Sequence, residues 1–252
     1  MTAPQPVLFL HGQPGNARDW RPLIAALDGR SRVIAPDRPG WDGSSPPTGL
    51  EGNAGAAAAA LDRAGVQQAT VVGHSFGAAV AAWLAATRPG RVSALVLVAP
   101  AANSDSLVPL DRLLAIPVLG DVLGAGALTG AGLTLANPTL RRRIARRLSL
   151  DSSYLRSAGR RLIAPASWRA FSSEQRTLIR ELPALERRLW AISAPVTVVA
   201  GTADRIVPVA SAQKLAGQIP RARLVQLPGA DHLMPQHRAG ELAEIVLAAV
   251  SG

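Results

Sequence analysis

The chain has 252 residues, of which 48% are apolar and 17% charged, and it carries a formal net charge of +10. It contains no cysteine, which excludes disulfides and thiolate metal sites, and its four histidines do not fall at metal-ligand spacing. Aromatic residues make up only 4% of the chain, too few for a base-stacking platform, so the positive charge does not indicate nucleic-acid binding. We therefore expect a protein with one large core, no metal and no cofactor.

Short apolar runs alternate with helical patterns in the first hundred residues and again near the C-terminus. The predicted strands are residues 7–10, 33–35, 70–72, 95–98, 196–200 and 224–227. The predicted helices are residues 20–27, 53–64, 76–87, 209–218 and 239–250. Because the strand runs are apolar throughout rather than alternating, they suit strands that are covered on both faces. The pattern predicts an α/β fold with a mostly parallel sheet of about six strands and helices on both faces.

The alternation stops between residues 101 and 190, which read as helices and turns without a convincing strand. The sequence thus predicts a core in two parts, residues 1–100 and 191–252, separated by a helical insertion of residues 101–190. With 14 arginines and 7 acidic residues, the insertion has a net charge of +7. This charge suits a solvated helix face, and the alternative is attraction of an anionic substrate or surface.

The first part of the insertion, residues 107–136, is rich in Leu, Val, Ala and Gly. Asp111, Arg112 and Asp121 interrupt it, which favours ordinary helix packing over a membrane-facing loop. No uninterrupted apolar stretch approaches the roughly 20 residues that span a bilayer, and the N-terminus shows no signal-peptide pattern. We expect a cytoplasmic protein without stable membrane insertion, and the sequence leaves its oligomeric state open.

Residues 71–79 combine an apolar strand, a Gly-x-Ser-x-Gly motif and the start of an alanine-rich helix. A sharp turn from strand to helix would lift the hydroxyl of Ser75 above the sheet and point the first free N–H groups of the helix at the group it attacks. Gly73 and Gly77 would let the backbones on either side pass closely. The motif therefore predicts that Ser75 is a nucleophile.

Two later loops supply an acid and a base, since Asp204 and His232 each follow the end of a predicted strand. A serine hydroxyl needs a base to take its proton, and an acid fixes the tautomer of that base. Asp105, after the strand before the insertion, is the alternative acid. Asp231 adjoins His232, and we interpret it as structural because neighbouring residues in a loop seldom point at each other.

The order Ser75, Asp204, His232, each after a strand, resembles the catalytic triad of the α/β-hydrolase family. The run His11-Gly12-Gln13-Pro14 is similar to the family's His-Gly-x-Pro oxyanion motif, and residues 37–45 are similar to its Asp-x-Pro-Gly-x-Gly-x-Ser loop. The resemblance runs from about residue 6 to the C-terminus and implies that the insertion is a cap over the active site.

The same resemblance implies an oxyanion hole made of the backbone N–H groups of Gln13 and Phe76, with a Gln13–Pro14 bond that is often cis in this motif. His11 and His74 are expected to be scaffolding, and His237 to lie on the surface. Family members usually begin with an antiparallel strand pair, for which six residues leave no room. We expect a sheet reduced to six parallel strands, with residues 33–35 at an edge, or a chain start that is annotated late.

Dehalogenases and epoxide hydrolases of the family have aspartate at the position of Ser75, so the serine implies acyl transfer to water. The resemblance and the apolar insertion together imply a metal-free serine esterase that acts on a small, fairly apolar carboxylic ester. The alternatives are a C–C bond hydrolase or perhydrolase with the same triad, or a ligand receptor on the hydrolase fold. His74 stands where hydrolases of ring-fission products usually have asparagine, which disfavours C–C cleavage.

Overall fold

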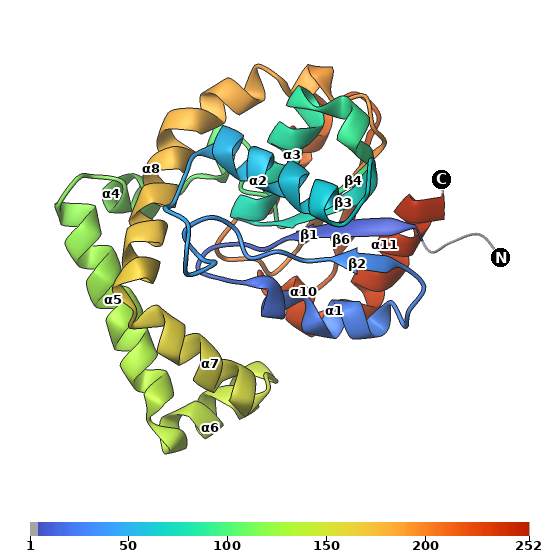
Figure 1. Cartoon of the computed structure of the whole chain (residues 1–252). Coiled ribbons are helices and arrows are strands. Elements are labelled where there is room, and N and C mark those ends of the chain that lie inside the picture. Colours follow the sequence, from blue (N-terminus) through green and yellow to red (C-terminus); the bar gives the residue numbers. More distant parts are fainter. Residues whose placement is uncertain (1–4, 252) are drawn as a thin grey trace.

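A computed structural model describes residues 5–251 of the chain (Figure 1). In these residues six strands form one parallel sheet in the order β2-β1-β3-β4-β5-β6. The strands are β1 (Pro6–Leu10), β2 (Arg32–Ile34), β3 (Ala69–His74), β4 (Val92–Val98), β5 (Val196–Gly201) and β6 (Ala222–Leu227). The prediction of a six-stranded parallel sheet with its second strand at an edge is confirmed for this part of the chain.

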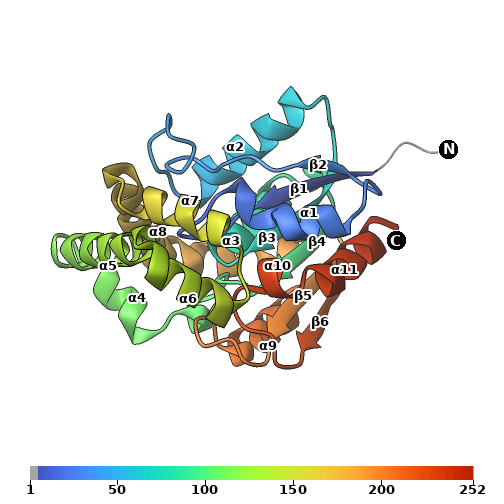
Figure 2. The ribbon, with the colours of Figure 1, turned by 90° about the horizontal axis from the view of Figure 1, so that it is seen from below.

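Helices cover both faces of the sheet. One face carries α2 (Leu50–Arg63), α3 (Phe76–Thr87) and α9 (Val209–Gln218). The other carries the 3-10 helix η1 (Ala17–Trp20), α1 (Arg21–Ala26), α10 (Met234–His237) and α11 (Ala239–Ser251), which lie in front of the sheet in Figure 2. Alternate residues of the central strands enter the two layers of core, which is why these strands are apolar throughout.

The sheet order places a topological switch between β1 and β3. The chain leaves β1 towards β2 along one face of the sheet, and it leaves β3 towards β4 along the other. The loops after β1 and β3 therefore diverge and leave a crevice at the carboxyl ends of these strands. In open α/β sheets this crevice is where ligands bind, and here it lies between the His-Gly-Gln-Pro loop and Ser75.

Residues 109–186, hereafter the helical segment, lie between β4 and β5 and stand beyond one end of the sheet (Figure 1). The segment comprises α4 (Pro109–Leu114), α5 (Leu119–Ala136), α6 (Pro138–Leu148), α7 (Ser152–Leu162) and α8 (Pro165–Glu186), and it is flanked by the 3-10 helices η3 (Ser104–Ser106) and η4 (Leu189–Ala191). Helix α8 packs on α3 of the core, and α5 packs on α7 and α8.

Helix α2 begins three residues before its predicted start. Its first N–H group, that of Leu50, donates a 2.8 Å hydrogen bond to Oε2 of Glu181 in α8. A helix start that lacks a local capping side chain needs such a partner for its free N–H groups. The carboxylate of Glu181 thus extends α2 from a position 131 residues away.

Candidate active site

Ser75 occupies a sharp turn between β3 and α3. Its backbone has φ 53° and ψ −119°, a region that a residue with a side chain enters only when its surroundings enforce it. A Cβ at Gly73 would collide with the carbonyl of Gly77, and a Cβ at Gly77 would collide with the carbonyl of Leu10 at the end of β1. The two glycines therefore let the turn and β1 approach closely enough to hold Ser75 in this conformation.

The loop after β1 lies against Ser75. A Cβ at Gly12 would come within 3.1 Å of the Ser75 Cβ. The Gln13–Pro14 bond is cis, as the motif implies. In the described part of the chain, the N–H of Gln13 donates to no protein acceptor, and neither does that of Phe76, the first residue of α3. Both N–H groups are thus free to bind an anionic oxygen.

His232 and Asp204 meet at the carboxyl end of the sheet. Nδ1 of His232 lies 2.9 Å from Oδ2 of Asp204, whose Oδ1 accepts hydrogen bonds from the N–H groups of Ile206 and Val207. Burial raises the pKa of Asp204, but the hydrogen bonds from His232 and the two N–H groups outweigh it and leave the pKa below its ordinary value. A charged Asp204 accepts a hydrogen bond from Nδ1–H of His232, which leaves Nε2 as the basic nitrogen.

The loops that carry these two residues are joined by their backbones. The N–H of Ala203 donates a 2.9 Å hydrogen bond to the carbonyl of Ala230, and the N–H of Gly229 donates to the hydroxyl of Thr202. A Cβ at Gly201 would collide with the same carbonyl of Ala230. Glycine at the end of β5 therefore allows the acid loop and the histidine loop to pack together.

The other candidate acids lie elsewhere. Asp105 pairs with Nζ of Lys214 at 2.7 Å on the surface. Asp231 accepts from the N–H of Leu233 and lies 3.0 Å from Nδ1 of His237. Neither carboxylate hydrogen-bonds to His232. His237, expected on the surface, is partly exposed, and its ring pairs with Asp231.

His74 links the serine turn to the histidine loop. Its Nε2–H donates a 2.9 Å hydrogen bond to the carbonyl of His232, and the two rings lie 4.8 Å apart. Burial and the neighbouring His232 lower the pKa of His74 to about 3, so the ring is neutral. In the described residues no hydrogen bond joins Ser75 Oγ to His232, and such contacts often tighten only when substrate binds.

Sequence reasoning missed Arg38, which is buried beneath the loop after β1. Its Nε donates to the carbonyl of His11 at 2.8 Å, and its Nη2 donates to the carbonyl of Gly12 at 3.1 Å. Nε2 of His11 accepts a hydrogen bond from the N–H of Arg38. Burial and the Arg38 charge hold the pKa of His11 well below its ordinary value. Arg38 thus fixes the two peptide groups that precede Gln13.

The charge of Arg38 is balanced by Glu174 of α8, which is fully buried and binds the guanidinium through both carboxylate oxygens. Nε1 of Trp41 also donates to Glu174, at 3.0 Å. Burial raises the pKa of Glu174 above its ordinary value, against the lowering effect of Arg38. The sequence around Arg38 and Gly40 is typical of a turn. It does not indicate the ion pair, because the glutamate lies 136 residues away in the chain and only the fold brings the two together.

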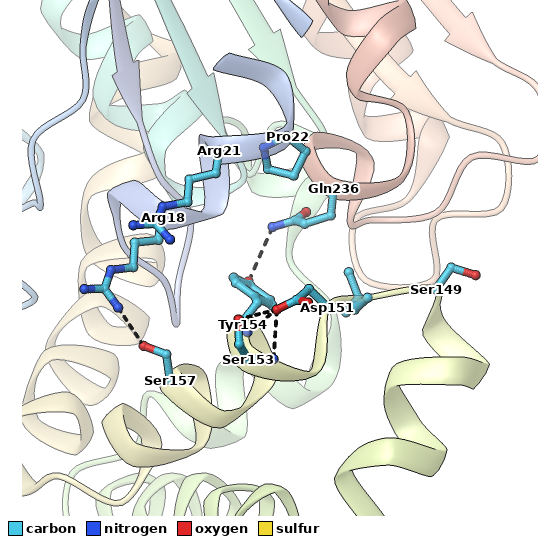
Figure 3. Close-up of a pocket in the computed structure, with 10 residues that line it drawn as sticks. Arg18, Arg21, Pro22, Ser149, Asp151, Ser153, Tyr154, Ser157 and Gln236 are labelled. Atoms are coloured by element: carbon cyan, nitrogen blue, oxygen red, sulfur yellow. Dashed lines mark hydrogen bonds between the residues drawn. The ribbon is translucent and has the colours of Figure 1, made fainter. Parts of the chain in front are cut away.

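A cavity of about 350 Å³ lies where the helical segment meets the core (Figure 3). The hydroxyl of Tyr154 in α7 donates a 3.0 Å hydrogen bond to Asp19 in η1, and the side-chain amide of Gln236 in α10 reaches the same hydroxyl at 3.5 Å. Helix η1 follows the loop after β1, and α10 follows His232. The cavity therefore lies beside the elements that follow the two loops, and neither Ser75 nor His232 lines it.

Within residues 5–251, no group of three or more His, Asp and Glu side chains is placed to hold a metal ion. The groups assembled at the carboxyl end of the sheet are a strained serine, two free N–H groups and a histidine–carboxylate pair. Such a set can take a proton from a hydroxyl and stabilise an oxyanion.

Known proteins share this fold and parts of this sequence. A "2-hydroxymuconate semialdehyde hydrolase" of Pseudomonas sp. is 27% identical over 96% of this chain and 85% of its own length. "Lipase LipV" of Mycobacterium tuberculosis is 40% identical, but the match spans 55% of this chain and only 56% of the lipase.

Solved structures superimpose over the whole chain. The crystal structure of a hydrolase from Pseudomonas aeruginosa has a TM-score of 0.75 at 25% identity, covering 100% of this chain and 92% of its own. An enol-lactonase from Burkholderia xenovorans has a TM-score of 0.77 at 21% identity, covering 100% and 93%. A family model described as the alpha/beta hydrolase fold matches residues 5–235. This match and the six-stranded parallel sheet together show that the chain belongs to the α/β-hydrolase family.

Proposed function

We propose that the protein is a serine hydrolase that cleaves a small, fairly apolar carboxylic ester through an acyl-enzyme on Ser75. The observation that supports this proposal most directly is the 2.9 Å contact between His232 Nδ1 and Asp204 Oδ2, in loops tied to the Ser75 turn through His74. In this proposal Ser75 is the nucleophile, His232 the general base and Asp204 the group that orients the imidazole.

The reaction would proceed in two acyl transfers. Nε2 of His232 takes the proton of Ser75 Oγ while this oxygen bonds to the ester carbonyl carbon. The N–H groups of Gln13 and Phe76 donate to the oxyanion that forms. His232 then passes the proton to the departing alkoxide, and an alcohol leaves. Water repeats the sequence on the acyl-enzyme and releases the acid, restoring Ser75.

We propose that the helical segment is the cap over this site, because two of its side chains reach the core beside the loops after β1 and β2. Glu174 binds Arg38, and Tyr154 binds Asp19. The apolar composition of residues 107–136 supports an apolar substrate only in part, since many of its large side chains are exposed. The size of the substrate pocket is therefore best determined by measuring which acyl chain length the enzyme prefers.

Hydrolytic C–C cleavage is the second candidate, and the relative named 2-hydroxymuconate semialdehyde hydrolase, which matches nearly the whole chain, favours it. The same serine, histidine and aspartate would serve, with a carbon leaving group in place of an alcohol. The two candidates differ in the bond cleaved and not in the groups that the site provides.

The test is hydrolysis of p-nitrophenyl esters from acetate to laurate, beside loss of the 2-hydroxymuconate semialdehyde chromophore, with wild type and Ser75→Ala. Ser211→Ala is a matched control, because Ser211 is also buried but lies in α9. Ester turnover that Ser75→Ala abolishes and Ser211→Ala retains supports the esterase. Turnover of the semialdehyde alone supports the C–C hydrolase, and turnover of neither substrate contradicts both and favours a ligand receptor.

A further inference from the structure

Helix α5 is exposed in a way that its composition does not predict. Among residues 5–251 it is the one helix long and apolar enough to cross a membrane by length and composition, yet only 28% of it is buried. A helix that is apolar on every side is normally enclosed by protein or lipid, so the exposed side of α5 needs an explanation.

The buried part of α5 is a narrow stripe. Gly120, Gly124, Leu128 and Gly132 recur every fourth residue and form its only buried positions. A Cβ at Gly124 would lie 3.2 Å from the ring of Phe171 in α8, and one at Gly132 would crowd α7. Small residues thus let α5 press against α7 and α8 along one line, while the side opposite this line faces outward.

The outward side is apolar and extends into α4 and the turn that joins the two helices. Eight of the thirteen large apolar side chains that are exposed in residues 5–251 fall between residues 110 and 133. Val118 is 73% exposed and Val122 is 66% exposed. The eight residues are Leu110, Leu113, Ile116, Val118, Leu119, Val122, Leu123 and Leu133. The helix packing expected for residues 107–136 is present along the glycine stripe and does not extend to this side.

Positive charge follows directly in α6. Residues 122–150 contain five arginines and no acidic residue. Four of the arginines, at positions 142, 143, 146 and 147, are exposed. Helices α4, α5 and α6 lie along the outer edge of the helical segment in Figure 1, and Figure 2 shows α5 on the opposite side of the molecule from β6. The outer side of α4–α6 thus combines exposed apolar residues with uncompensated arginines.

We propose that this outer side binds the surface of an anionic lipid bilayer. Its apolar residues enter the boundary between headgroups and acyl chains, and the arginines of α6 contact the anionic headgroups. Asp121 in the first turn of α5 pairs with Arg176 of α8 at 2.7 Å, and the glycine stripe holds α5 on the folded segment. Helix α5 therefore lies on the bilayer and does not cross it.

Charge favours a bilayer over a second copy of the chain. In a two-fold symmetric dimer the same surface would face itself. The two carboxylates of α4–α6 already have partners, since Asp111 accepts from the N–H of Val108 and Asp121 pairs with Arg176, so neither is available to the arginines of α6. An anionic bilayer supplies those negative charges. The proposal concerns binding only and does not depend on which bond the active site cleaves.

The test is co-sedimentation of the intact protein with vesicles of phosphatidylcholine alone or mixed with phosphatidylglycerol. We expect binding that needs the anionic lipid and weakens in 0.5 M salt. Replacing Arg142, Arg143 and Arg146 by Gln should weaken it roughly 100-fold, since each cation near such a surface contributes about fivefold. The matched control replaces three other exposed arginines, at positions 63, 187 and 221, and should leave most of the binding intact.

The apolar contribution is tested by Val122→Asp, with Trp190→Asp as its control, because Trp190 is 74% exposed but lies outside the helical segment. Val122→Asp should weaken vesicle binding at least tenfold and Trp190→Asp should not. Equal effects of the two, or no preference for anionic vesicles, would overturn the proposal. Size-exclusion chromatography completes the test: a dimer that Val122→Asp dissociates, without vesicle binding, would assign this side to a second copy.

Discussion

Arg38, in the loop after β2, and Glu174, in α8, form an ion pair in which both side chains are buried. The guanidinium of Arg38 also donates to the carbonyls of His11 and Gly12. The pair therefore joins the helical segment to the peptide groups that precede Gln13, whose N–H we assign to the oxyanion hole.

Removing one partner of this pair should cost both stability and catalysis. Glu174→Leu leaves the Arg38 charge buried without compensation, which typically costs about 3–5 kcal/mol of unfolding free energy. We expect the double variant Arg38→Met with Glu174→Leu to be less destabilised, because no unpaired charge remains. Its kcat should still fall roughly 10- to 100-fold as the loop after β1 shifts.

Urea unfolding and ester kinetics measure the two effects separately. Glu241→Gln, which breaks the exposed pair with Arg238, is the control and should change stability by less than about 1 kcal/mol. A double variant with wild-type kcat would mean that the buried pair stabilises the fold without positioning the loop.

The backbone of Ser75 should be strained in the folded protein. A non-glycine residue held at a positive φ such as 53° costs roughly 1–3 kcal/mol. Ser75→Ala should abolish turnover and leave the melting temperature nearly unchanged, because it keeps the Cβ. Ser75→Gly should abolish turnover and raise the unfolding free energy by about 1 kcal/mol over Ser75→Ala. Equal stability of the two variants in chemical denaturation would show that the turn is not strained.

The identity of the acid can be decided by two matched substitutions. Asp204→Asn offers an amide to His232 and should stabilise the wrong tautomer, lowering kcat by about 10³- to 10⁴-fold. Asp105→Asn removes only a surface pair with Lys214, so its kcat should stay within twofold of wild type. Steady-state kinetics on one p-nitrophenyl ester distinguishes them. A larger loss in Asp105→Asn would refute the assignment of Asp204.

His74 should make the protein sensitive to mild acid. Its folded-state pKa of about 3 lies below the unfolded value of 6.5, so between these values the unfolded chain binds more protons. The contribution of His74 to the free energy of unfolding is therefore fully present above pH 6.5, and it is lost as the pH decreases towards 3. His74→Gln keeps an N–H donor for the carbonyl of His232 but does not titrate. Urea unfolding at pH 7, 6, 5 and 4 should show a shallower decline for this variant, and an unchanged slope would contradict the explanation.

The sheet and the triad candidates could be predicted because both depend on local sequence. Strands buried on both faces are apolar throughout, and Ser75, Asp204 and His232 each follow a strand in a turn-rich loop. The start of α2 at Leu50 could not be predicted, since the group that accepts its N–H belongs to Glu181. The role of Arg38 could not be predicted either, because its partner Glu174 lies 136 residues away in the chain.

The exposure of the apolar side chains of α5 was the other property that the sequence did not predict. The apolar residues of α5 recur on every side of the helix, a pattern typical of enclosed helices. Its glycine stripe permits close packing along one line only, and nothing in the local sequence tells which sides remain uncovered.

Two acidic residues of α8 bind groups of the core, and a third binds the chain just after β4, where the insertion begins. Glu174 binds Arg38, Glu181 accepts from the first N–H of α2, and Glu186 accepts from the N–H of Ser104 after β4. Although α8 follows the other helices of the insertion in the chain, it is anchored to the core at two points and to the start of the insertion at a third. We therefore expect that the part of the insertion that can be exchanged without disturbing these contacts is shorter than the insertion. It ends before Pro165, where α8 begins, and a chimera cut there would keep all three anchors.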